Sequence, residues 1–302
     1  LAGEDARVVG VGRRVDESRW LEEEGVDLRR ADLLDRQRMR EMVAGNDLVI
    51  HAAGWLYGDT EMARPVNVEA TADLVRMAAE EGVRRVVHVS TLGAYARPDD
   101  PDRPIDESHP LAPDAAGAYQ RTKAEGEIRS RQVADDRGLE LAVLRPGMVF
   151  GPRSGTWTVG MCRAVCEGRP VLIGDGKGHF HPLYIDDLVA AVLTCAVATD
   201  AAGEAYNPCQ EPVTFRSYLS EYGELCGREP ASMPTWLARL MALGNRLSGL
   251  DFPVDDTWLA LATNRLRFST RKAREELGWE PEVGYEEGLA RTKEWLRAQG
   301  HV

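Results

Sequence analysis

Residues 85–89 read Arg-Val-Val-His-Val, and residues 141–144 read Leu-Ala-Val-Leu. Such short, almost continuously apolar runs are typical of strands that are covered on both faces of a parallel sheet. Similar runs occur at residues 7–11, 26–28 and 47–51. Helical patterns separate the runs, at residues 17–24, 36–43, 68–81 and 118–135. This alternation predicts βαβ crossovers, and therefore an α/β fold built on a doubly wound parallel sheet of the Rossmann type.

The pattern changes after Pro152. Beyond it the elements are shorter, proline is more frequent, and a helical stretch that contains tryptophan covers residues 234–263. We therefore expect residues 1–152, together with about 186–200, to form the sheet domain, and residues 153–302 to form mainly a smaller mixed lobe. Open α/β sheets bind ligands at the carboxyl ends of their strands. We expect the lobe to cover that edge and to bind the substrate.

The composition excludes several classes of protein. The 302-residue chain has a formal net charge of −12, which would repel the phosphate backbone of a nucleic acid. No apolar run approaches the ~18 residues of a membrane span, and the first residues lack the layout of a signal peptide. We therefore expect a cytoplasmic protein that acts on a small molecule, with neither nucleic acid nor a membrane as its partner.

The sequence predicts no disulfide framework and no metal site. Its five cysteines are Cys162, Cys166, Cys195, Cys209 and Cys226. Their number is odd and they form no C-x-x-C motif, so we interpret them as small core residues in a reducing compartment. His179 and His181 are a spaced pair, but no acidic or cysteine cluster flanks them at the spacing of metal ligands. Trp236, Trp258 and residues 237–247 belong either to the core or to the lining of an apolar pocket.

The first residues allow two interpretations. Gly10-Val11-Gly12 resembles the start of a dinucleotide-binding fingerprint, but Val15 stands where the third glycine would be. Alternatively, residues 7–11 form the second strand of the sheet, and the first strand and its glycine-rich loop precede Leu1. We prefer the second interpretation, in which residues 1–5 are the end of the first helix and its turn.

A candidate catalytic group consists of Tyr119 and Lys123, with Thr91 after the strand at residues 85–89. On a helix, positions i and i+4 share a face, so Tyr119 and Lys123 point the same way. A tyrosine with an ordinary pKa near 10 is a poor acid–base catalyst unless a nearby cation stabilises its anion. The lysine can also donate to a ribose hydroxyl, and the threonine hydroxyl can hold a substrate oxygen. The alternative is a surface tyrosine beside a solvated lysine.

Seven motifs then follow one another along the chain. They are Asp32-Leu33 with Asp35, residues 51–54 (HAAG), 67–71 (NVEAT), 89–95 (VSTLGAY), 144–152 (LRPGMVFGP), 182–187 (PLYIDD) and 277–281 (LGWEP). In this order they resemble the extended short-chain dehydrogenase/reductase family, also called the NAD-dependent epimerase/dehydratase family, over essentially the whole chain. Two features depart from it: Ala70 replaces a usual glycine, and the G-x-x-G-x-x-G loop of the family is not in this sequence.

The resemblance implies that the sheet domain binds NAD(P) and that Thr91, Tyr119 and Lys123 are catalytic. The cofactor contacts that it implies are Asp32, Leu33, His51, Ala52, Ala53, Gly54, Tyr119, Lys123, Pro146, Gly147 and Met148. Arg13 and Arg14 follow the strand at residues 7–11, where guanidinium groups favour the 2′-phosphate of NADP. We therefore expect NADP in preference to NAD, unless these arginines are solvated loop charges.

We predict an NAD(P)-dependent oxidoreductase that moves hydride between the nicotinamide and a carbonyl or alcohol of a small molecule. Thr91 is followed by Leu92-Gly93, not by the Asp-Glu pair of dehydratase relatives, and residues 180–182 (FHP) contain no arginine for a sugar nucleotide. The chain therefore resembles the 3β-hydroxysteroid dehydrogenase or dihydroflavonol reductase branch. A nucleotide-sugar epimerase with the same three residues, and an inactive NAD(P)-binding regulator, are the alternatives.

The resemblance also implies a homodimer that pairs the helices at residues 68–81 and 118–135. The first helix offers the apolar side chains Val68, Leu74, Val75, Met77 and Ala78. These cover more of the helix surface than the single stripe needed to pack on a sheet, whereas the second helix is more polar. We expect a charged, isologous interface.

Overall fold

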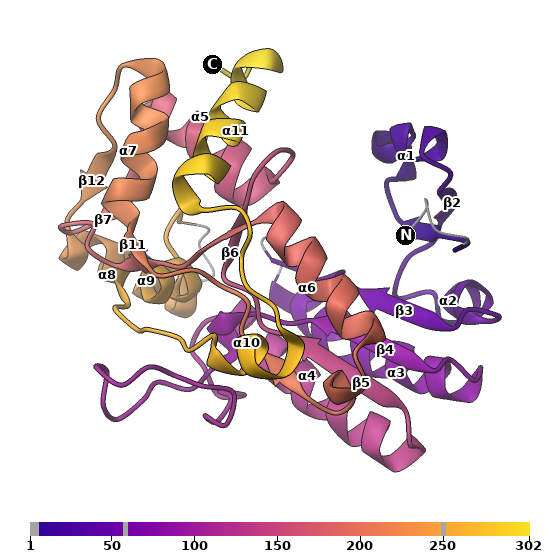
Figure 1. Cartoon of the computed structure of the whole chain (residues 1–302). Helices are drawn as coiled ribbons and strands as arrows, with labels where there is room; N and C mark the ends of the chain where they lie inside the picture. The colour runs from indigo at the N-terminus through magenta and orange to yellow at the C-terminus, as the bar shows by residue number, and fades with distance from the viewer. Residues whose placement is uncertain (1–5, 57–59, 249–251) are drawn as a thin grey trace.

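Four parallel strands form the central sheet, in the order β10-β5-β4-β3, and Figure 1 labels β5, β4 and β3. The four strands are β3 (Leu48–His51), β4 (Arg85–Val89), β5 (Glu140–Leu144) and β10 (Ala205–Tyr206). In this computed structural model, which describes residues 6–56, 60–248 and 252–302, β1 (Val9–Gly12) and β2 (Asp27–Arg30) form a separate parallel pair. The predicted α/β fold with a parallel sheet is confirmed.

The strand β1 tests the fingerprint interpretation of the first residues. Gly10 and Gly12 pair with Leu28 and Arg30 of β2, so they belong to a strand and do not form a phosphate-binding turn. The fingerprint interpretation is therefore wrong, because that turn needs irregular backbone between a strand and a helix. The strand and loop expected before Leu1 stay a prediction, and residues 1–5 lie outside the described part of the chain.

Both faces of the central sheet are covered, as a doubly wound fold requires. Side chains alternate along each strand: Val86 of β4 faces a cluster with α2, α3 and α4, whereas Val87 faces a cluster with α6. These helices are α2 (Arg36–Val43), α3 (Thr71–Glu80), α4 (Ala118–Arg137) and α6 (Ile185–Val197). The continuous apolar pattern of the strands therefore reflects burial on two sides.

Two predicted helices differ from the observed ones. The helix expected at residues 17–24 is a 3-10 turn (Val15–Ser18) followed by the single-turn α1 (Trp20–Glu23), and residues 22–24 are exposed. The helix expected at residues 68–81 starts earlier, because a π-helical turn (Pro65–Ala70) leads into α3. Proline suits a first helical position, since its missing N–H would have no partner there.

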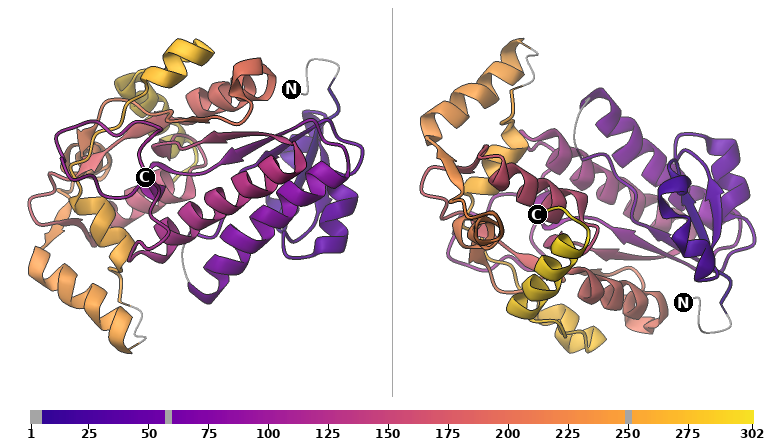
Figure 2. Two further views of the ribbon diagram at one scale, coloured as in Figure 1. Left: turned by 90° about the horizontal axis from the view of Figure 1, so that it is seen from below. Right: turned by 90° about the horizontal axis from the view of Figure 1, so that it is seen from above.

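The second half of the chain builds most of a lobe beside the sheet (Figure 2), and aromatic side chains contribute much of its core. Its strands are β6 (Met148–Phe150), β7 (Pro170–Ile173), β8 (His179–Phe180), β9 (Pro182–Tyr184), β11 (Val213–Thr214) and β12 (Ala231–Met233). Its helices are α5 (Met161–Cys166), α7 (Phe215–Cys226), α8 (Thr235–Ser248), α9 (Asp256–Thr263) and α11 (Tyr285–Ala298). Helix α10 (Arg271–Leu277) instead packs with α6 on the sheet, because Ala273 belongs to the cluster that contains Val87. Phe180 and Tyr218 stack at 3.8 Å inside the core of the lobe. The boundary after Pro152 stays a prediction.

The prediction that all five cysteines are free is wrong at two positions. Cys166 and Cys226 form a disulfide between the ends of α5 and α7, with their Cα atoms 5.6 Å apart. The other three, Cys162, Cys195 and Cys209, are free and buried, as expected of small core residues. The packing of α5 against α7 brings together two cysteines that sequence spacing alone does not pair.

The apolar residues that we assigned to a dimer interface lie inside the chain. Val68, Leu74, Val75, Met77 and Ala78 are all buried, because α3 packs against both the sheet and α4 (Figure 2). They are therefore not available as an intersubunit surface, and that basis for the predicted homodimer is wrong. The described helices include none that is long and apolar enough to cross a membrane.

Candidate active site

A cavity of about 1690 Å³ lies where the carboxyl ends of β3, β4 and β5 meet the second lobe. Residues that follow these strands form one part of its wall: Ala52, Ala53, Gly54, Ser90, Thr91, Pro146, Gly147 and Met148. Helix α4 adds Tyr119, Gln120 and Lys123. The parallel strand order explains this convergence, since the chain leaves each strand at the same edge of the sheet.

Thr91 begins a short 3-10 turn (Leu92–Ala94) directly after β4. Its Oγ1 accepts a hydrogen bond of 3.1 Å from the backbone N–H of Gly93. The hydroxyl hydrogen is then available to donate to another oxygen, because a hydroxyl is both donor and acceptor. Thr91 thus presents a hydrogen-bond donor to the cavity from a fixed position.

Tyr119 and Lys123 lie one turn apart on α4, and both line the cavity. The Lys123 side chain is buried, and its Nζ donates a 2.7 Å hydrogen bond to the backbone oxygen of Val89. Burial lowers the pKa of Lys123 to about 8, against the opposing charge of Glu127. Lys123 is therefore not the solvated surface lysine of the alternative interpretation.

Two buried histidines lie on the strands next to Lys123. His51 and His88 stack with ring centroids 5.1 Å apart, and His51 Nε2 lies 3.0 Å from the Thr71 hydroxyl. Burial, together with the positive charge of Lys123, lowers the pKa of His51 to about 3 and lowers that of His88 as well. Both imidazoles are therefore neutral at physiological pH and leave Lys123 as the local cation.

One further turn along α4, the buried carboxylate of Glu127 forms an ion pair with the buried guanidinium of Arg145. Arg145 Nε lies 3.1 Å from both carboxylate oxygens, and its other end donates 2.6 Å to the Tyr95 hydroxyl. Burial alone would raise the pKa of Glu127, but the hydrogen bonds and charge of Arg145 lower it overall. This pair ties α4 to the segment after β5, and both elements border the cavity.

Asn67 fixes the loop that follows β3. Its side-chain oxygen accepts 2.7 Å from the N–H of Trp55, and its amide donates to Trp55 O and Thr122 Oγ1, both at 3.0 Å. Residues 52–54, which precede Trp55, therefore have a defined position beside α4. Because their side chains are small, they leave the cavity open along this stretch.

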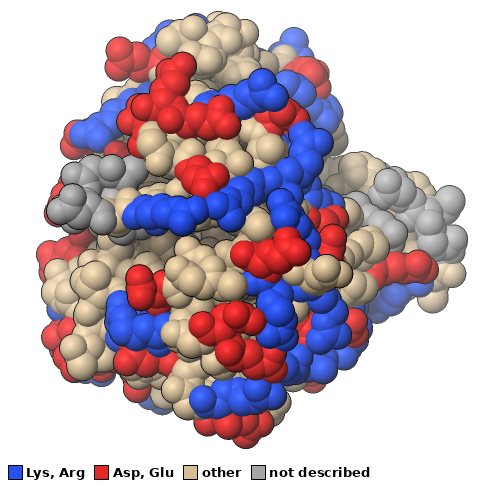
Figure 3. Space-filling view, turned by 90° about the vertical axis from the view of Figure 1, so that its right-hand side faces the viewer, with Lys and Arg blue, Asp and Glu red and all other residues tan. Residues whose placement is uncertain are grey.

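Five of the predicted cofactor contacts do not reach the described wall of the cavity: Arg13, Arg14, Asp32, Leu33 and His51. The guanidinium of Arg13 lies 5.5 Å from the ring of Trp55, which follows the cavity-lining residues 52–54. Arg14 contacts Glu17 at 3.4 Å, and Asp32 accepts from Leu34 N within its own turn. On this side of the molecule positive and negative side chains are interspersed (Figure 3).

Sequence reasoning missed the opposite wall. Apolar and aromatic side chains from the second lobe form it: Trp157, Tyr184, Ile185, Leu259, Leu261, Leu266 and Phe268. Near the sheet domain, the guanidinium of Arg153 stacks on Trp20 at 3.8 Å, and both residues line the cavity. Arg153 is the non-glycine residue with positive φ among those described. Tyr184 and Ile185 fall within the PLYIDD motif at residues 182–187, but no local pattern marks the other residues of this wall, because they come together only when the lobe packs on the sheet.

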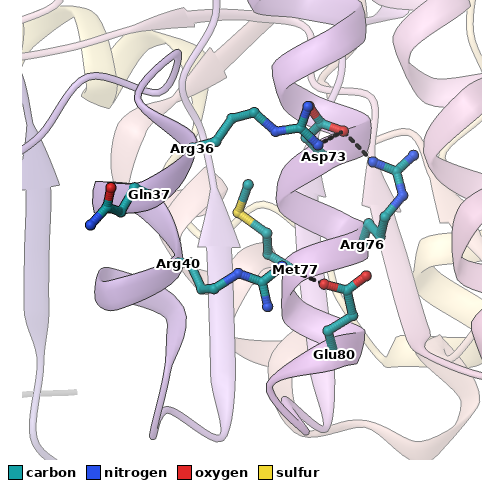
Figure 4. Close-up of a pocket in the computed structure, with 7 residues that line it drawn as sticks. All are labelled: Arg36, Gln37, Arg40, Asp73, Arg76, Met77 and Glu80. Carbon is teal, nitrogen blue, oxygen red and sulfur yellow. Dashed lines mark hydrogen bonds and ion pairs between the residues drawn. The ribbon is translucent and has the colours of Figure 1, made fainter.

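A second, smaller hollow of about 370 Å³ lies between α2 and α3 (Figure 4). Arg36 and Arg76 both contact Asp73, and Arg40 contacts Glu80. Each of these three arginines already has a carboxylate partner, so the hollow is a surface ion-pair cluster.

Among the described residues, no group of three or more His, Cys, Asp or Glu that could hold a metal ion is found around His179 and His181. A nitrogen of each ring lies 2.9 Å from the same backbone oxygen, that of Leu266. Both rings therefore serve to hold the backbone beside the cavity.

A sequence profile of the NAD-dependent epimerase/dehydratase family matches residues 1–209. The chain belongs to this family. It is therefore an NAD-dependent enzyme of the oxidoreductase and epimerase class. The resemblance that the seven motifs suggested is confirmed.

Several characterised relatives resemble the chain. The 2-alkyl-3-oxoalkanoate reductase of Stenotrophomonas maltophilia is 30% identical, over 89% of this chain and 86% of the relative. An Arabidopsis thaliana 3β-hydroxysteroid dehydrogenase/decarboxylase is 28% identical over 87% of this chain, which spans 65% of that protein's length. The UDP-glucose 4-epimerase of Mycolicibacterium smegmatis is 29% identical over 77% of this chain and 68% of the relative.

Solved structures show the shared fold. The dTDP-glucose 4,6-dehydratase DesIV of Streptomyces venezuelae, solved with NAD bound, superposes with a TM-score of 0.78 at 22% identity, over 96% of this chain and 87% of that one. MoeE5 in complex with UDP-glucose and NAD gives 0.72 at 23% identity, over 97% and 99%.

Proposed function

We propose that this enzyme is an NAD(P)-dependent oxidoreductase that moves hydride between the nicotinamide and a carbonyl or alcohol carbon of an apolar small molecule. The observation that carries this function is one shared cavity: Thr91, Tyr119 and Lys123 line it together with an apolar wall from the second lobe. The nearness of an oxoalkanoate reductase and a hydroxysteroid dehydrogenase among the relatives supports the same class.

The residues at the strand ends fit the nicotinamide end of a dinucleotide. Ala52, Ala53 and Gly54 present only small side chains. Gly147 packs so closely that an added Cβ would lie 2.4 Å from the backbone oxygen of His181. An ammonium has three donors, and Lys123 gives one to Val89, so it retains capacity for ribose hydroxyls. When bound, the cofactor supplies or accepts the hydride.

In the reducing direction, Tyr119 donates its phenolic proton to the carbonyl oxygen while the carbonyl carbon gains hydride, so that C=O becomes CH–OH. Lys123, one turn away, stabilises the phenolate that remains. The Thr91 hydroxyl, which already accepts from Gly93 N, donates to the substrate oxygen and orients it. In the oxidising direction the same groups act in reverse, and the phenolate removes the alcohol proton.

The wall opposite these residues favours an apolar substrate. Trp157, Leu259, Leu266 and Phe268 present hydrocarbon surface, whose burial against an apolar ligand is favourable by roughly 25 cal/mol per Å². A ring system or an alkyl chain next to the carbonyl would match this wall. A free sugar would bury hydroxyl groups there without partners, which is costly.

A nucleotide-sugar epimerase is the second candidate. It is supported by the Mycolicibacterium relative and by arginines that line the cavity, among them Arg97 and Arg239. A guanidinium is well suited to pair with a diphosphate. An epimerase takes hydride and returns it, so it consumes no cofactor in net terms.

We also propose NADP as the preferred cofactor. Arg13 lies beside Trp55, which follows the cavity-lining residues 52–54, and Arg14 is largely exposed. A homodimer and a cytoplasmic location stay predictions from the sequence.

The test is a cofactor balance. The purified protein is incubated with NADPH or NADH and a panel of alkyl and cyclic ketones or UDP- and dTDP-sugars, and both cofactor absorbance and product are measured. Loss of NADPH in proportion to alcohol formed is expected. Isomerised sugar nucleotide without net cofactor loss would identify the epimerase, and no turnover with either panel would contradict both.

A further inference from the structure

Helix α8 carries an apolar stripe on its outer face. Trp236, Leu240, Leu243 and Leu247 follow one another at helical spacing and are 68%, 57%, 42% and 76% exposed. At 100° per residue they lie within a narrow arc of the helix surface. Single exposed leucines are common on proteins, but four on one face form a continuous patch, and such patches mark interaction sites.

The opposite face of α8 already holds the helix to the lobe. Ala238 and Ala242 are buried, and Leu237 and Met241 pack against a cluster that includes Val254. The outer stripe is therefore not needed for the fold. In both views of Figure 2 the light-orange helix α8 protrudes at the margin of the molecule, so a flat surface could reach the stripe.

The charge of α8 differs from that of the whole chain. The helix contains two arginines, Arg239 and Arg246, and no acidic residue, although the chain has a net charge of −12. Both arginines lie on the same edge of the stripe by helical spacing. Arg246 also contacts Asp256 at 2.7 Å, yet its side chain remains 58% exposed. An apolar stripe bordered by arginine matches an interfacial helix on an anionic surface.

We propose that α8 docks the enzyme on the surface of an anionic lipid bilayer, with Trp236 and the three leucines inserted at the level of the headgroups. Arg246, at the edge of the stripe and outside the cavity lining, would then contact lipid phosphates. This differs from the expectation of no membrane partner, which rested on the absence of a span; an interfacial helix does not need one. Thr235 and Arg239 of the same helix line the cavity, so a docked bilayer would lie beside the active site.

A second copy of the chain fits this surface less well. It would cover the leucines with leucines, but α8 of a partner offers no carboxylate to Arg239 and Arg246. A bilayer that contains phosphatidylserine supplies both hydrocarbon and negative charge. Docking through α8 does not depend on which substrate the enzyme takes.

The test is co-sedimentation of the full chain with vesicles of phosphatidylcholine alone or mixed with phosphatidylserine. We expect binding to the mixed vesicles that weakens with salt and is at least tenfold weaker for Leu240→Asp/Leu243→Asp. Val197→Asp is the matched control, because Val197 is 75% exposed on α6, away from α8. Circular dichroism verifies that each variant is folded, and Leu240→Ser/Leu243→Ser serves if the aspartates unfold the lobe.

Two outcomes would overturn the docking of α8 on lipid. One is a wild-type chain that does not sediment with the mixed vesicles, or a double variant that sediments equally well. The other is light scattering that shows a dimer of the wild type, dispersed by the α8 substitutions, without any binding to vesicles. That result would assign the stripe to a second copy of the chain.

Discussion

Lys123 is the residue whose surroundings constrain its chemistry most. It is buried between α4 and β4, with neutral His51 and His88 nearby and Glu127 one turn away. Burial lowers its pKa to about 8, so at neutral pH it is still the cation that a neighbouring phenolate requires. A less buried lysine would hold its proton more firmly but would be screened by water.

The lowered pKa of Lys123 predicts a specific pH dependence of stability. Below about pH 8 both the folded and the unfolded chain hold the proton, and the folded chain bears the cost of a buried charge. Between about 8 and the ordinary value near 10.5 the unfolded chain binds more protons, so stability rises with pH. Across this pH window, urea titrations should show the unfolding free energy of the wild type increasing relative to that of Lys123→Met. An unfolding free-energy difference between the two proteins that does not change with pH in this window would contradict the burial of the Lys123 cation.

Arg13 and Arg14 predict cofactor selectivity. A charge-assisted contact to the 2′-phosphate contributes roughly 1.5–3 kcal/mol, so Arg13→Ala/Arg14→Ala should weaken NADP at least tenfold more than NAD. Fluorescence titration of both cofactors measures this. Arg7→Ala is the control, because Arg7 lies before β1 and pairs with Asp27. Equal losses for NADP and NAD would place the 2′ group elsewhere.

At the scale of elements, α4 is held to the sheet by a buried ion pair. Removing one partner of such a pair costs about 3–5 kcal/mol, because the other charge is left without compensation. Glu127→Gln should therefore lower the unfolding free energy by that amount. Glu125→Gln on the same helix is the control. Glu125 forms an ion pair with Arg64 that is partly exposed, with side chains 30% and 51% accessible. Its loss should lower the unfolding free energy by less than about 1 kcal/mol. Similar losses for both variants would contradict the buried pair's role.

The approach of α4 to the turn before α3 requires a glycine. An added Cβ on Gly126 would lie 2.0 Å from the backbone oxygen of Asn67, so Gly126→Ala forces the two segments apart. We expect a loss of roughly 1–3 kcal/mol and weaker cofactor binding, since Asn67 also holds the loop before Trp55. Gly284→Ala, where an added Cβ meets open space, should be close to neutral in thermal unfolding. Equal stability of both variants would contradict the close packing.

Elements that depend on local pattern were predictable from the sequence, and those that depend on packing were not. The strand at residues 85–89 and the helix at 36–43 have the predicted bounds. Burial of one or both faces of these elements produces a clear hydrophobic pattern in the sequence. The Cys166–Cys226 disulfide arises from packing between segments 60 residues apart in the sequence. Trp236 is neither core nor pocket lining, since the period of α8 shows two apolar faces but not which one is covered.

At the scale of the whole molecule, the sheet domain and the second lobe form the cavity together. The strand ends supply small residues and Thr91, α4 supplies Tyr119 and Lys123, and the lobe supplies the apolar wall. The order of the motifs in the sequence predicted the residues at the strand ends and those on α4, because each of these groups follows a strand or begins a helix. Apart from Tyr184 and Ile185 in the PLYIDD motif, the named residues of the lobe's wall belong to no motif, although this wall is the part that would decide the substrate.

The central claim is that Tyr119 transfers the proton in an oxidoreductase reaction. Its most direct test is the rate of NADPH consumption by Tyr119→Phe and by wild type, with a ketone that the wild type reduces and with cofactor affinity measured alongside. We predict turnover lower by a factor of about 10² or more, as for a lost general acid, with cofactor binding nearly unchanged. Turnover close to that of the wild type would contradict the account.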